Sequence, residues 1–285
     1  MNIQFQCFEC IHKQTMNLAN KIGQNEEEKA LAYVEISNIV NLCIKNKVTP
    51  PEVAGLCYDY FENKTKNQDL FREIKDKSTA LALDLYPYLE ELVSKSDDEF
   101  AARVLLAIAG NVIDFGATPN FKLEDAKDEI VKVLTIQYDQ ELISKLHSKL
   151  ESAKKVLYIL DNCGEAVIDR LLIEKYAKKI TIAVRGRAIM NDITTNDIIT
   201  SKLDFVPVVN TGINIPGVTL KKSSKEFLTE YNTADLIIAK GQGNFESLYD
   251  DIKKEAFFLF KVKCPVISKY LNRPLGSIEI MPKNI

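Results

Sequence analysis

The sequence predicts an α/β protein with an all-helical N-terminal domain, residues 1–152, and a doubly wound, mostly parallel α/β C-terminal domain, residues 153–285. The first half reads as a series of helices. The second half alternates short apolar runs with polar helical stretches, and seven of the 11 glycines follow residue 150. Continuous apolar runs that alternate with helices are typical of parallel strands buried on both faces, so the two halves differ in architecture.

Each expected helix in the first half has a local signal. Helices are expected over 25–43, from residue 50 onward, and over 69–94, 100–115 and 141–153. Acidic residues at 26–28 and 97–99 stand where a helix dipole favours negative charge. Pro50 suits the first turn of a helix, and Pro87 is expected to bend the long one.

The second half contains six apolar runs that fit strands. They lie at residues 156–160, 180–184, 205–209, 236–239, 257–262 and, as a further candidate, 277–281. The polar stretches between successive runs are long enough for crossover helices, which parallel strands require. The expected product is one open, doubly wound sheet with helices on both faces.

Composition narrows the class of protein. Among 285 residues, 37 Lys and Arg stand against 40 Asp and Glu, a net charge of −3, so the basic surplus of a typical nucleic-acid binder is missing. No secretory signal or membrane span is apparent, and six cysteines are too few for a disulfide scaffold. We therefore expect a cytoplasmic protein without nucleic-acid or membrane partners; the oligomeric state has no readable signal.

Polar residues follow four of the apolar runs. Asp161-Asn162 and Glu165 follow the first, Arg185 and then Asn191-Asp192 the second, Asn210 the third, and Lys240-Gly241 with Asn244 the fourth. In open parallel sheets ligands bind outside the carboxyl ends of the strands. These side chains are therefore expected to converge at one edge of the sheet.

The expected set suits an anion held beside a divalent cation. Asp161, Asn162 and Asp192 are hard oxygen ligands appropriate for Mg²⁺ or Mn²⁺. Lys240 and Arg185 could neutralise phosphate oxygens, and the glycines from Gly241 could let backbone N–H groups approach an anion. Taken singly, the Asp161-Asn162 and Asn191-Asp192 pairs could instead be helix caps or turns, and both interpretations stay open.

Two further features come from the helical half. Asn111 and Asp114 share one face of the expected 100–115 helix, where they either bridge helices or project into the site. Cys7-x-x-Cys10 with His12 could bind zinc, carry redox chemistry or pack beside the substrate. A closed zinc site would need four ligands, and the sequence has no second C-x-x-C.

These segments together resemble the damage-control phosphatase family, also called domain of unknown function 89. The resemblance spans nearly the whole chain and points to the stand-alone prokaryotic branch with an N-terminal C-x-x-C. It is carried by Cys7-x-x-Cys10, Gly110-Asn111-x-Ile113-Asp114-x-Gly116, Asp161-Asn162-x-Gly164-Glu165, Arg185-Gly186, Asn191-Asp192-x-Thr194 and Lys240-Gly241-x-Gly243-Asn244-x-Glu246. Ala188 departs from the proline expected after Arg185-Gly186.

The resemblance implies a metal-dependent phosphatase of small phosphorylated metabolites, such as sugar phosphates or damaged phosphometabolites. By position, Asp161, Asn162 and Asp192 would hold a divalent ion, Mg²⁺ or Mn²⁺ with Ni²⁺ and Co²⁺ as further candidates. Lys240 would contact the phosphate, and the substrate would meet residues on both sides of the cleft. These are Asn111, Asp114, Glu165, Arg185, Gly241 and Asn244.

The nucleophile and two other functions stay open at this point. Either an activated water or Asp161 itself could attack phosphorus. A second interpretation is an S-adenosylmethionine-dependent carboxyl methyltransferase, although the acidic Asp161 stands where its cofactor loop would lie. A third is a phosphate-ligand-binding module without catalysis.

Overall fold

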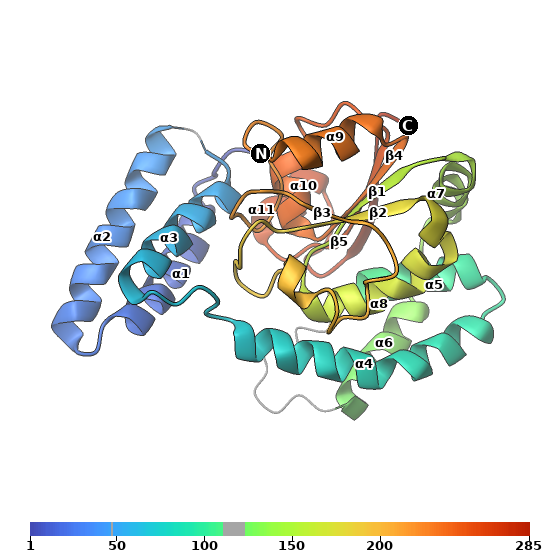
Figure 1. The fold of residues 1–285 in the computed structure, drawn as a ribbon, viewed down its shortest axis with the longest axis horizontal. Helices are drawn as coiled ribbons and strands as arrows, with labels where there is room; N and C mark the ends of the chain where they lie inside the picture. The colour runs from blue at the N-terminus through green and yellow to red at the C-terminus, as the bar shows by residue number, and fades with distance from the viewer. Residues whose placement is uncertain (47, 111–122) are drawn as a thin grey trace.

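A computed structural model of the protein describes residues 1–46, 48–110 and 123–285. Within them six strands form one sheet in the order β3-β2-β1-β4-β5-β6 (Figure 1). The strands are β1 (Val156–Ile159), β2 (Ile180–Val184), β3 (Val208–Asn210), β4 (Leu236–Lys240), β5 (Ala256–Lys261) and β6 (Ile278–Lys283). All neighbouring pairs are parallel except β5 and β6, so the predicted mostly parallel, doubly wound sheet is confirmed.

Both faces of the sheet are covered by helices, which explains the continuous apolar strands. Tyr158 of β1 packs on the side of α5 (Glu99–Ala109), α7 (Gln140–Ser152) and α8 (Cys163–Ile173). The next residue, Ile159, packs on the opposite side with α9 (Lys225–Thr233), α10 (Gln242–Leu248) and α11 (Pro265–Leu271). Alternate strand residues point to opposite faces, so a strand covered on both sides must be apolar throughout.

The N-terminal helices divide into two packing groups. Helices α1 (Cys7–Ile22), α2 (Glu26–Lys45) and α3 (Pro50–Thr65) share a core of their own. Helix α4 (Arg72–Ser94), α5 and α6 (Leu123–Leu134) pack instead on α8, next to the sheet (Figure 1). The second group therefore shares cores with the α/β part, and the division at residues 152/153 stays a prediction.

Some element boundaries differ from the sequence expectations. Strand β3 begins at Val208 because Pro207 has no N–H to donate to the sheet, and β6 runs through Pro282, which an edge strand tolerates. Helix α4 is continuous across Pro87. The expected 100–115 helix ends at Ala109, and Asn111 and Asp114 lie outside the described residues.

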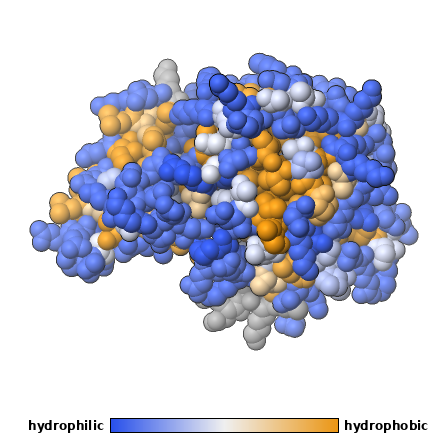
Figure 2. Space-filling model, in the orientation of Figure 1, coloured by the Kyte–Doolittle hydropathy of each residue, from blue (hydrophilic) through white to orange (hydrophobic). Residues whose placement is uncertain are grey.

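The surface is mostly polar on the face shown in Figure 2, with apolar residues gathered in separate patches over the α2–α3 end and over the α/β part. On α2 the side chains of Leu31, Val34 and Leu42 are exposed. None of the helices in the described ranges has the length and hydrophobicity that crossing a bilayer requires.

Candidate active site

The carboxyl ends of three adjacent strands bring the predicted polar residues together. Strand β1 lies between β2 and β4, so Asp161 after β1, Arg185 after β2 and Lys240 at the end of β4 are neighbours at one sheet edge. Arg185 and Lys240 are completely buried and Asp161 is 8% exposed. The predicted convergence of these strand ends is present in the fold.

The segment after β2 turns back along the end of β1 and carries Asp192 into the same place. Ile193 N donates to Asp161 O at 2.9 Å, Cys163 N to Asn191 O at 3.0 Å, and Arg185 N to Ile193 O at 3.0 Å. Asn162 and Asp192 thus face each other in a short antiparallel bridge. This backbone pairing sets the spacing of the three predicted metal ligands.

The alternative that these pairs are helix caps or turns is partly right. Asn191 lies in a turn, in which Asp192 N donates to Ile189 O at 3.1 Å, but Asp192 caps no helix. Thr194, not Asp192, caps the short 3₁₀ helix η2 (Thr195–Asp197), through a capping box with Asp197. Asn162 occupies the N-cap position of α8 but makes no side-chain capping hydrogen bond. The side chains of Asn162 and Asp192 therefore make no capping hydrogen bond to a helix end.

Arg185 binds both acids at once. Its Nε donates to Asp192 Oδ2 at 2.6 Å, its Nη2 to Asp161 Oδ1 at 3.2 Å, and its Nη1 to Asn244 Oδ1 at 3.2 Å. Asn244 in turn donates to the carbonyl of Lys240 at 2.6 Å. A planar guanidinium suits such a fork, so Arg185 holds the two carboxylates and Asn244 holds Arg185. Both residues stay candidates for substrate binding.

Lys240 is surrounded by acceptors of the protein itself. Its Nζ donates to Glu165 Oε1 at 2.5 Å, Asp169 Oδ1 at 2.6 Å and Ala107 O at 2.8 Å. These three contacts match the three protons of an ammonium group. Direct phosphate contact by Lys240 stays a prediction, and it requires the ammonium to leave one of these partners.

Sequence reasoning missed the partners of Lys240. Asp169 lies four residues after Glu165, on the same face of α8, and also accepts from Tyr158 Oη at 2.9 Å. The i, i+4 acidic pair, in a helix whose only other charged residue is Arg170, was a usable signal. Burial raises the pKa of Glu165 to about 8, against the attraction of Lys240 and with repulsion from Asp161, and burial also raises the pKa of Asp169.

Asp161, Asn162 and Asp192 offer a donor set that fits a divalent ion. Two carboxylates and one amide are oxygen donors of the kind that Mg²⁺ and Mn²⁺ accept, with water completing the shell. Burial, opposed by Arg185 and reinforced by Asp161, raises the pKa of Asp192 to about 7. The described residues include no group of three or more His, Cys, Asp or Glu placed around one point, so the fit depends on Asn162 as the third donor.

Gly241 passes very close to the side chain of Asp161. Its own N–H donates to Leu259 O at 3.0 Å, and the expectation that backbone N–H groups of the 241–243 segment approach an anion stays a prediction. Its φ is +81°, and a Cβ atom there would lie 2.0 Å from Asp161 Oδ2. Only glycine lets the chain pass this close to the carboxylate.

A cleft of about 860 Å³ opens beside Asp161, Asn162, Glu165 and Asp192, whereas the predicted substrate residues Arg185, Lys240, Gly241 and Asn244 do not line it. One wall holds Asp161, Asn162, Glu165 and Asp192, and the other is formed by α1 and the N-terminal ends of α3 and α4. The cleft is large enough for a phosphorylated metabolite rather than phosphate alone. The helical part of the chain thus completes the site.

The C-x-x-C lies within the first turn of α1. Cys7 and Cys10 line the cleft together with Cys264 and Glu246. Burial raises the pKa of both Cys7 and Cys10. The zinc, redox and packing interpretations of the pair all stay predictions.

The fold and this cleft define a doubly wound α/β protein with an acidic site at the carboxyl edge of its sheet. The chain belongs to the family described as the damage-control phosphatase ARMT1-like domain, which it matches over residues 3–278. The resemblance to this family inferred from the sequence motifs is thereby confirmed, and the branch indicated by the N-terminal C-x-x-C stays a prediction.

Relatives and solved structures agree with this membership. The crystal structure of a DUF89 family protein from Pyrococcus horikoshii superposes with a TM-score of 0.88 at 33% identity, covering 99% of both chains. A protein of Methanocaldococcus jannaschii is 35% identical over 295 residues, covering 99% of this chain and 96% of its own. A damage-control phosphatase of Archaeoglobus fulgidus is 30% identical over 216 residues, covering 74% and 75%.

Proposed function

We propose that this protein is a divalent-metal-dependent phosphatase that hydrolyses small phosphorylated metabolites. The observation that carries the proposal is the placement of Asp161, Asn162 and Asp192 at the end of β1, facing an 860 Å³ cleft. Membership in the damage-control phosphatase family supports the phosphatase activity, and the oxygen donor set supports the metal.

Each group at the sheet edge has a defined task in this proposal. A divalent ion held by Asp161, Asn162 and Asp192 would supply Lewis-acid polarisation of a phosphoryl oxygen and a water of lowered pKa. Arg185 keeps the two carboxylates in place and offsets part of their charge. Glu165 accepts a hydrogen bond from Lys240 at the same edge of the cleft, where burial raises the pKa of its carboxyl group. Water and Asp161 remain the two candidate nucleophiles.

The test is a screen of phosphorylated metabolites against the purified protein with Mg²⁺, Mn²⁺, Co²⁺ or Ni²⁺, and with a chelator. We expect phosphate release that the chelator abolishes and that added metal restores. Asp192→Asn should lose turnover because it replaces a negatively charged ligand with a neutral one, whereas Asp204→Asn, at an exposed acid between η2 and β3, should not. Hydrolysis that survives both the chelator and Asp192→Asn would refute the metal site.

A further inference from the structure

A buried ion cluster joins α4 to the segment that carries Asp192. The cluster consists of Asp69, Arg72, Lys75 and Asp197, and the side chains of Lys75 and Asp197 are completely buried. Arg72 Nη1 lies 2.6 Å from Asp197 Oδ1, Lys75 Nζ lies 3.5 Å from Asp197 Oδ2, and Lys75 Nζ lies 3.2 Å from Asp69 Oδ2. The two contacts with Asp197 link residues more than 120 positions apart in the chain.

Asp197 transmits this contact to the site through Thr194. Its Oδ2 accepts from Thr194 N at 2.8 Å and from Thr194 Oγ1 at 2.7 Å. Thr194 ends the short segment whose residue Ile193 hydrogen-bonds to Asp161 and Arg185, next to Asp192. Burial opposes ionisation of Asp197, but Lys75, Thr194 and Arg72 outweigh it and lower its pKa, so the carboxylate stays charged.

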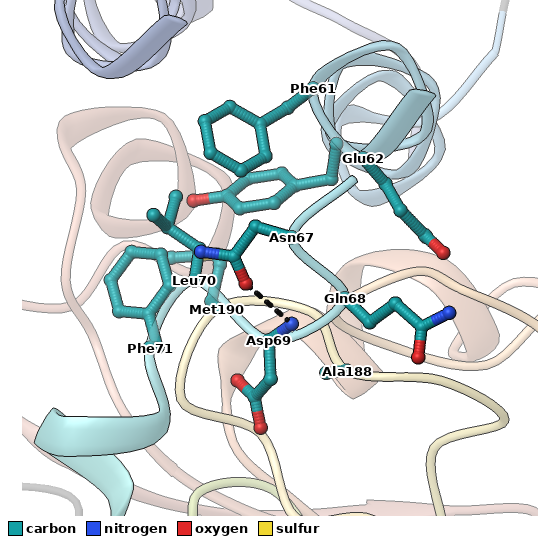
Figure 3. Close-up of a pocket in the computed structure, with 10 residues that line it drawn as sticks. Phe61, Glu62, Asn67, Gln68, Asp69, Leu70, Phe71, Ala188 and Met190 are labelled. Atoms are coloured by element: carbon teal, nitrogen blue, oxygen red, sulfur yellow. Dashed lines mark hydrogen bonds between the residues drawn. The ribbon is translucent and has the colours of Figure 1, made fainter. Parts of the chain in front are cut away.

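The same segment has a second contact with the chain that leads into α4. Figure 3 shows Asn67, Leu70 and Phe71 beside Ala188 and Met190, around one small pocket. Met190 has φ +48°, a left-handed conformation that a long side chain rarely adopts. Such a conformation persists only where the surroundings hold it, and here they include the connection between α3 and α4.

A buried ion pair is a poor source of stability, because its desolvation offsets most of the Coulomb attraction. Its better-attested effect is to fix one arrangement of the groups around it. An apolar pair of equal volume would join α4 to η2 as firmly, but it could not accept hydrogen bonds from Thr194. The cluster is therefore suited to fixing the position of the segment that carries Asp192 and ends at Thr194.

We propose that Asp197, gripped by Arg72 and Lys75, is a positioning residue that fixes the backbone of Asp192, so that α4 sets the geometry of the candidate metal site. The expected effect on metal affinity rests on the proposed function. The hold on the segment itself can be measured without metal or substrate. As a positioning residue, Asp197 contacts neither the metal ion nor the phosphate.

The experiment compares Asp197→Asn, Lys75→Met, the double variant and the control Tyr86→Phe. Tyr86 also lies on α4, and its hydroxyl group donates to Glu174 Oε2 at 2.9 Å. Tyr86→Phe removes this hydrogen bond and so weakens a contact of α4 that does not involve η2. Hydrogen exchange of the peptide over residues 185–197 measures how firmly the segment is held. Calorimetric titration measures the affinity for Mn²⁺, and urea unfolding measures the free energy of unfolding.

We expect Asp197→Asn and Lys75→Met to speed exchange of the Asp192–Thr194 amides about tenfold and to weaken Mn²⁺ binding about 10- to 100-fold, as loss of residues that orient metal ligands typically does. The double variant removes both buried charges, so its stability should partly recover while exchange and Mn²⁺ binding stay impaired. Tyr86→Phe should change neither.

Other outcomes separate this inference from the proposed function. Unchanged exchange in Asp197→Asn and Lys75→Met would overturn the positioning role, as would Mn²⁺ affinity that follows stability alone across all four variants. A wild-type protein that binds no Mn²⁺ would overturn the proposed metal site, and faster exchange in the variants would still support the hold of Asp197 on the segment.

Discussion

Arg185 Nε lies 2.6 Å from Asp192 Oδ2, and the same guanidinium reaches Asp161 Oδ1 at 3.2 Å. One buried cation thus spans two acids that the chain separates by 31 positions. Without it, two carboxylates at the ends of neighbouring segments would repel each other in a low-dielectric site. Asp161, Asp192 and Asn162 together present oxygen atoms to the cleft. Two carboxylates beside one guanidinium leave an excess negative charge, which a dication can neutralise.

Replacing Arg185 with lysine tests the fork. Lys keeps the charge but cannot serve three acceptors in one plane, so we expect a loss of about 1.5–3 kcal/mol in unfolding free energy and at least tenfold weaker Mn²⁺ binding. Arg187→Lys is the matched control, because Arg187 pairs with Asp59 and Glu62 at the exposed surface, where the effect should be below about 1 kcal/mol. Equal effects of both changes would contradict the role given to Arg185.

Gly241→Ala tests the close approach to Asp161. The left-handed backbone costs about 1–3 kcal/mol for alanine, and the new Cβ displaces the carboxylate. Gly276→Ala provides the control, since Gly276 has φ +87° but its nearest neighbour to a Cβ is Lys261 Cε at 3.8 Å. Urea unfolding should show a loss for both variants, whereas Mn²⁺ titration should show weaker binding for Gly241→Ala alone.

Lys240→Met distinguishes a buried counter-ion from a phosphate ligand. Removing the ammonium leaves Glu165 and Asp169 without their cation, so we expect a loss of about 3–5 kcal/mol in stability. Tyr158→Phe removes one hydrogen bond to Asp169 and should cost about 1 kcal/mol. A Lys240→Met protein of normal stability with a raised KM would instead support direct phosphate contact.

The pH dependence of stability should reveal Glu246. Burial, opposed by Gln242 and the N-terminal ammonium, raises its pKa to about 7 from 4.5. The folded state then holds the proton more tightly than the unfolded state, so stability is retained below about pH 4.5 and falls as the pH rises towards 7, by at most about 1.4 kcal/mol per unit.

Glu246→Gln should flatten this fall, and Glu226→Gln, at an exposed acid of α9, should leave it unchanged. Urea unfolding at several pH values measures the difference. Parallel stability curves for wild type and Glu246→Gln between pH 4.5 and 7 would show that Glu246 does not carry the effect.

Much of the fold and the site could be predicted because strand ends follow a topological rule. The apolar runs predicted a parallel sheet, and a parallel sheet places the residues after β1, β2 and β4 at one edge. This was sufficient to bring Asp161, Asn162, Asp192, Arg185 and Lys240 together. The boundaries of β3 and β6 were less accurate, because Pro207 and Pro282 act through their place at a sheet edge.

The amino-acid sequence by itself determined the order of helices and strands, the edge where polar groups gather, and the family motifs. Only the tertiary structure decided which charges pair. It placed Lys240 against Glu165 and Asp169, Arg185 between two acids, and α4 against Asp197. The reason is physical: side-chain type and local pattern follow from neighbours along the chain, whereas burial and pairing depend on distances between residues that only the packed fold brings into contact.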